Sequence, residues 1–143
     1  MANLPEMELL QYIYKTADMG CEGIDTVEPH AEDKLLEELK RERNEYETIR
    51  SHADQMIRNG GDEPQGSGMM AKLSADVMAS GQMMMDDSRS KIAEMMIQGT
   101  TMGIVKTIRH LKDYEGKDEK ARDLGQKLLE LQEQNVENMK AYL

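Results

Sequence analysis

Three histidines and a large set of carboxylates are the residues of this chain that could do chemistry. On a helix, a Glu-x-x-His pair places two metal ligands on one face, because residues three apart are neighbours. No acidic residue stands three positions before His30, His52 or His110. The sequence therefore contains no complete metal motif that pairs a carboxylate with a histidine.

A site built only from oxygen ligands is the alternative, since hard cations bind carboxylate and amide oxygens without any histidine. The residues that could approach a layer in the middle of a helical bundle are Asp18, Glu22, Glu42, Glu45 and Asn135. Such a layer would take iron or manganese. The simpler interpretation is that Glu42 lies in a helix seam beside an Arg or Lys and that the other carboxylates are exposed, so we expect no cofactor.

The sulfur-containing residues favour packing over catalysis. Cys21 is the only cysteine, which excludes an intrachain disulfide and a cysteine-based metal cluster. Its acidic neighbour Glu22 would raise a thiol pKa, so we expect a small core residue. The 14 methionines include the consecutive residues 83–85, which point in different directions on a helix. We find no phosphate-binding loop or nucleophile motif, and predict no catalytic residue.

Apolar residues recur at helical spacing and predict an all-α domain that spans residues 1–143. Four long helices are expected over residues 5–26, 29–58, 90–115 and 119–142. Pro29 is expected in the first position of the second helix and Gly60 as the left-handed residue that ends it. A connection over residues 59–87 separates the two hairpins and contains a predicted short helix at 67–80.

That connection is far longer than antiparallel neighbours need, so it should run from one end of the bundle to the other. Two antiparallel helical hairpins joined by such a crossover resemble the ferritin-like superfamily. The resemblance covers the whole chain as architecture, and it implies a four-helix bundle with a fifth, short helix in the crossover. The Glu-x-x-His pairs of ferritin-like di-iron proteins are absent here, so the resemblance does not extend to their chemistry.

The middle of the third long helix is rich in small residues. Gly99 and Gly103 lie four apart, and we expect them to let this helix approach the first one closely at Ala17, Gly20 and Cys21. The apolar face of the third long helix is expected to include these residues: Ile92, Ala93, Met96, Ile97, Ile104, Ile108, Leu111 and Tyr114.

A formal net charge of −10 and an isoelectric point near 4.8 disfavour nucleic acid and anionic membrane surfaces, which are bound through clustered Lys and Arg. The Lys40-Arg41-x-Arg43 cluster is interleaved with glutamates. No run approaches the roughly 20 apolar residues of a membrane span, and we expect a cytoplasmic protein.

The wide apolar faces and the extra methionines predict a homodimer, with the Met-rich crossover as a docking surface for a protein partner. The expected function is that of a non-catalytic structural or protein-binding module. The alternative is a carboxylate-based oxidoreductase or storage protein for iron or manganese.

Overall fold

The computed structural model describes residues 4–66 and 88–143, and no strand occurs among them. Its four long helices are α1 (Leu4–Val27), α2 (Asp33–Asn59), α5 (Arg89–Asp113) and α6 (Glu119–Lys140). A 3₁₀ turn, η1 (Glu28–His30), follows α1 directly. The prediction of an all-α bundle of four long helices is confirmed. The short helix expected at 67–80 and most of the expected crossover lie outside the described residues.

Side-chain caps begin the two helices of the second hairpin. Ser88 accepts a hydrogen bond from the backbone N–H of Lys91 (3.2 Å) and starts α5. Asp118 accepts a hydrogen bond from the backbone N–H of Lys120 (2.9 Å) and starts α6. Each cap satisfies a donor that the first helical turn leaves unpaired.

The start and the end of α2 differ from the sequence prediction. Pro29 lies in η1, because its fixed φ suits a tight turn that continues from α1, and α2 begins only at Asp33. Asp33 has φ of 52°, a left-handed conformation that Asp tolerates better than most residues. At the other end, Gly61 with φ of 87°, and not Gly60, is the left-handed residue.

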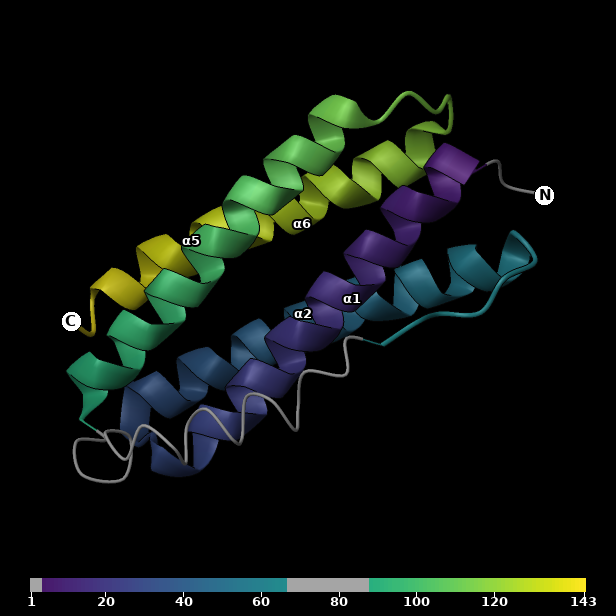
Figure 1. Cartoon of the computed structure of the whole chain (residues 1–143). Helices are drawn as coiled ribbons and strands as arrows, with labels where there is room; N and C mark the ends of the chain where they lie inside the picture. The colour runs from purple at the N-terminus through teal and green to yellow at the C-terminus, as the bar shows by residue number, and fades with distance from the viewer. Residues whose placement is uncertain (1–3, 67–87) are drawn as a thin grey trace.

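The helices form two antiparallel hairpins, and α2 and α5 run in the same direction (Figure 1). Tyr142, at the end of α6, donates a hydrogen bond to the carbonyl of Lys34 (3.3 Å), at the start of α2. Ser88 and Arg89 line a surface hollow together with Asp33, so α5 also starts at this end of the bundle. The helix α5 packs on α6 and α1, while α2 packs on α1 and α6, which leaves α2 and α5 across the bundle from each other.

The described part of the connection after α2 turns back along α1. Gln11 donates a hydrogen bond to the carbonyl of Glu63 (2.8 Å) and accepts one from the N–H of Gln65 (2.9 Å). The chain thus leaves α2 at one end of the bundle, follows α1, and resumes at Ser88 near the opposite end.

The buried stripes of α1, α2 and α6 follow the sequence prediction closely. The core contains the predicted residues Leu10, Ile13, Ala17, Cys21, Ile24, Val27, Ala31, Leu35, Leu39, Tyr46, Ile49, Ala53, Ala121, Leu124, Leu128, Leu131 and Met139. Glu42 lies in the seam of α2, as its spacing predicts. Ile57 is buried, and its neighbour Met56 packs at the edge of the core.

The inner face of α5 is predicted only in part: Ile92, Ala93 and Tyr114 are buried as expected and Met96 and Ile97 pack against the core, but the middle of the helix differs. Ile108, expected in the core, is 37% exposed, whereas its neighbour Thr107 is only 1% exposed. Met102 (65%) and Val105 (46%) also lie on the outside of this helix. In the middle of α5, small and polar residues therefore point inward and apolar residues point outward.

The glycines do not bring α1 and α5 into close contact, so the predicted close approach is wrong. A Cβ atom at Gly20 would lie 2.7 Å from the ring of Tyr46 in α2, and one at Gly103 would lie 2.7 Å from Nε2 of Gln132 in α6. A Cβ at Gly23 or Gly99 would meet no atom within 4 Å. A cleft therefore separates α1 and α5 at these two glycines.

Two glycines three residues apart on α1 should respond oppositely to alanine. Gly20→Ala drives a methyl group into the buried Tyr46 ring, and we expect a net loss of about 1–3 kcal/mol in the free energy of unfolding. Gly23→Ala adds a methyl group to open space and should gain up to about 1 kcal/mol through helix propensity. Urea denaturation followed by circular dichroism measures both; equal effects would contradict this packing.

Candidate functional site

Four buried polar side chains form a layer across the middle of the apolar core: Glu42 from α2, Thr107 from α5, and Gln132 and Asn135 from α6. Because residues three apart on a helix share a face, Gln132 and Asn135 both point into the bundle. Burying a polar group without a partner costs free energy, so the partners of these four residues define what the layer can do.

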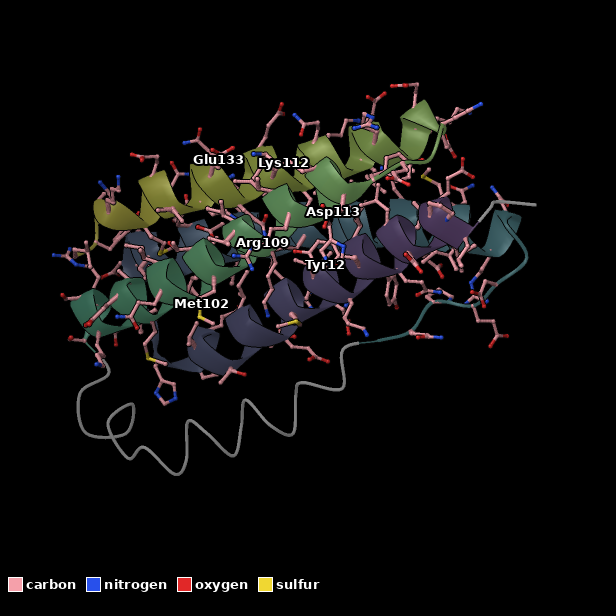
Figure 2. The ribbon with its side chains drawn as sticks, turned by 45° about the horizontal axis from the view of Figure 1, so that its top comes forward. Tyr12, Met102, Arg109, Lys112, Asp113 and Glu133 are labelled. Carbon is pink, nitrogen blue, oxygen red and sulfur yellow. The ribbon has the colours of Figure 1, made fainter. Side chains whose placement is uncertain are left out.

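Thr107 is the hub of the first half of the layer. Its hydroxyl lies 2.8 Å from Oε1 of Gln132 and 2.9 Å from the carbonyl of Gly103, both of which only accept. The Tyr12 hydroxyl, 2.8 Å away, therefore donates to Thr107. These bonds link α1, α5 and α6, and Figure 2 shows Tyr12 on the side of α1 that faces α5.

His110, one turn after Thr107, stacks on the Tyr12 ring with centroids 3.8 Å apart and an angle of 18° between the planes. Burial lowers the pKa of His110, against the opposing charges of Asp113 and Glu8. The neutral imidazole is thus favoured, and its role is to cover the Tyr12 ring.

Glu42 is the centre of the second half of the layer. Burial, followed by a hydrogen bond to Glu38 and the charge of Glu38, raises the pKa of Glu42 to about 9. The protonated Glu42 donates to the Glu38 carboxylate, and its Oε2 atom has no hydrogen-bond partner. Glu42 is therefore a neutral acid at physiological pH.

Glu38 remains ionised because several donors surround it. Burial alone would raise its pKa, but hydrogen bonds from Arg41, Glu42 and Asn138 lower the pKa of Glu38 below its usual range. Arg41 contacts Glu38 and also Glu45, and Asn138 of α6 donates to Glu38 over 3.3 Å. The Glu42 proton thus lies at the inner end of a charged network that reaches the surface.

Asn135 is the least satisfied member of the layer. Neither its Nδ2 nor its Oδ1 atom has a hydrogen-bond partner, although the side chain is 1% exposed. Tyr46 lies next to it: burial raises the pKa of Tyr46 to about 12, while Asn135 and Thr100 act to lower it. Asn135 and Oε2 of Glu42 are therefore the buried polar atoms that could accept a further partner.

A cleft of about 220 Å³ between α1 and α5 leads from the surface toward this layer. Tyr46 and Gln132 line its inner side, and the other walls are largely apolar. The remaining lining residues are Thr16, Met19, Gly20, Gly23, Thr26, Val27, Met95, Met96, Gly99, Thr100 and Gly103. The cleft can hold a side chain or a small apolar group.

The structure separates the five residues that the sequence offers as metal ligands. Asp18 pairs with Arg50 (2.8 Å), and Glu45 pairs with Arg41. Glu22 is half-buried on α1, where its carbonyl accepts a hydrogen bond from Thr26 (2.9 Å).

Only Glu42 and Asn135 of those five belong to the buried layer. Within residues 4–66 and 88–143, no three His, Cys, Asp or Glu side chains lie close enough together to hold a metal ion.

Thr107 was not among the candidate site residues that the sequence suggested. The missing signal was the spacing of Thr100, Gly103 and Thr107, which continues the helical seam of Ala93 and Met96 with small residues. On α6, the same spacing does reveal Asn135 and Gln132 beside Leu128 and Leu131.

Comparison of the chain with family models, with curated protein sequences and with solved structures found no match. Among the helices that the structure describes, none is long and apolar enough to cross a membrane.

Replacing the neutral acid of the layer should stabilise the protein at neutral pH. The pKa of Glu42 rises from 4.5 to about 9 on folding, so its contribution to stability is complete below about pH 4.5 and is lost as pH rises toward 9. Glu42→Gln keeps a donor for Glu38 without this proton, and should raise the free energy of unfolding at pH 7 by up to about 3 kcal/mol.

The measurement is urea denaturation of both proteins between pH 5 and pH 8, with Glu37→Gln as the control, because Glu37 is an exposed glutamate of the same helix. The difference between wild type and Glu42→Gln should grow with pH. A difference that stays constant over this range would show that Glu42 is ionised in the folded protein.

Proposed function

We propose that this chain is a non-catalytic helical bundle of ferritin-like topology that works as a protein-binding or structural module. The observation that carries the proposal is the outward apolar stripe of α5, formed by Met102, Val105 and Ile108. Monomeric proteins rarely leave such a stripe uncovered, and continuous apolar surface is typical of an interaction site.

The arrangement of the helices supports the ferritin-like part of the proposal. The two hairpins are antiparallel, α2 and α5 run in the same direction, and the chain after α2 turns back along α1 (Figure 1). A long crossover between the second and third long helices is the connection used in ferritin-like bundles.

The internal chemistry supports a non-catalytic role. Thr107 and its partners satisfy one another, and the cleft places no acid–base pair beside an open surface. We place the protein in the cytoplasm as part of this proposal, where the buried thiol of Cys21 stays reduced. The Met-rich segment within 67–87 lies outside the described residues, and docking of a partner there stays a prediction.

Site-specific photo-crosslinking in living cells tests the proposal. A photoreactive residue at Met102 should form covalent adducts with protein, because this position lies in the stripe. The same residue at Thr48, exposed on α2 across the bundle, serves as the control and should form few adducts. Equal labelling from both positions, or none from Met102, would contradict a binding role for α5.

A second candidate function, binding of iron or manganese, is favoured by one observation. Oε2 of Glu42 and Oδ1 of Asn135 are buried oxygens without partners, and the Glu38 carboxylate is adjacent to Glu42. A divalent cation could replace the Glu42 proton there, although it would compete with Arg41 for Glu38.

Elemental analysis separates the two candidates. Protein purified without chelators from cells supplied with iron and manganese should contain much less than one metal ion per chain, and Glu42→Gln should not change that value. Stoichiometric metal in the wild type that is lost in Glu42→Gln, but kept in Glu37→Gln, would assign the protein to the metal-binding class.

A further inference from the structure

The outer face of α5 has the spacing of a helix–helix seam. Its exposed positions Glu94, Gln98, Thr101, Val105, Ile108 and Lys112 follow one another at intervals of four and three residues. This alternation keeps side chains on one stripe of a helix and is the pattern by which two helices pack. Met102 lies at the edge of the stripe and is its most exposed apolar residue, at 65%.

The apolar centre of this stripe faces outward because the orientation of α5 is fixed from the inside of the bundle. The rotation of α5 is fixed by Thr107, which is bonded to Tyr12 and Gln132 on the inside. Of the five exposed large apolar residues in the described part of the chain, the two outside α5 are Leu4 and Leu143, near the ends. The stripe is thus the apolar surface that the fold holds in place and leaves uncovered.

The charges on the stripe favour an antiparallel pair of α5 helices from two copies of the chain. Glu94 lies at the beginning of the stripe, whereas Arg109 and Lys112 lie at its end. In an antiparallel pair of α5 helices related by a two-fold axis, Lys112 of each copy lies opposite Glu94 of the other. A parallel pair would instead place Lys112 against Lys112, which is unfavourable.

Shape complements charge in the antiparallel arrangement. Val105 then lies opposite Thr101 of the second copy, and Ile108 lies opposite Gln98, beside Gly99. Both copies thus bring the apolar centre of the stripe against uncharged residues of the other copy.

We propose that a second copy of this chain docks on the outer face of α5, antiparallel across a two-fold axis, with Lys112 and Glu94 as the pair that sets the orientation. This proposal rests on the proposed function as a protein-binding module and names its partner. The contact is isologous, so each residue of the stripe contributes twice.

Sedimentation velocity between about 1 and 100 µM protein tests this dimer, using the full chain. The wild type should be dimeric, and Val105→Asp should weaken association by roughly a hundredfold because it buries a charge at the apolar centre. Lys112→Glu or Glu94→Lys should each weaken it by roughly tenfold, since each creates two like-charge contacts. The double variant Glu94→Lys/Lys112→Glu should recover the wild-type affinity.

Lys127→Glu is the matched control: Lys127 is exposed on α6 beside His52 and Gln55 of α2, away from the stripe, and this variant should leave the dimer unchanged. All substituted positions are exposed, so circular dichroism should show the wild-type helix content. A strict monomer at 100 µM, a dimer insensitive to Val105→Asp, or a failure of the double variant to recover affinity would each overturn the proposal. Photo-crosslinks from Met102 to a different protein only would overturn the dimer and leave the proposed function standing.

Discussion

The hydrogen bonds of Thr107 are the constraint on which the rest of the structure depends. A threonine hydroxyl buried among helices must be paired, and Tyr12, Gln132 and the carbonyl of Gly103 supply its partners. Together they fix the rotation of α5 about its own axis. Because a helix has only one inner face, directing Thr107 inward sends Val105 and Ile108 outward.

Two features of the surface follow from this rotation. The middle of the inner face of α5 carries the small residues Gly99, Thr100 and Gly103, and a cleft opens between α1 and α5 at Gly23 and Gly99. The outer face presents an apolar stripe, whose residues would be buried in the core if α5 were rotated about its axis. A buried network that is fully satisfied can thus cost the fold some apolar burial and still specify a single arrangement of its helices.

Much of the fold could be predicted from hydrophobic spacing, because α1, α2 and α6 bury their most apolar stripe. Glu42 was predicted in its seam for the same reason. The face of α5 could not be predicted this way, since its local apolar preference and its packed orientation differ. The η1 turn was also missed, because Pro29 fits the first position of a helix and a 3₁₀ turn equally well.

The two halves of the polar layer differ in a way that the sequence does not reveal. Thr107 is hydrogen-bonded to Tyr12 and Gln132, whereas Asn135 and Oε2 of Glu42 are buried without a hydrogen-bond partner among the described residues. Leucine or methionine at these positions would avoid the free-energy cost of burying unpaired polar atoms. The polar residues therefore lower the stability of the fold. A polar residue in a seam of apolar contacts can fix the register of neighbouring helices, because only one alignment brings it next to other polar groups. Beside Glu42, the hydrogen bond from Asn138 to Glu38 joins α6 to α2 in the register that also places Gln132 beside Thr107.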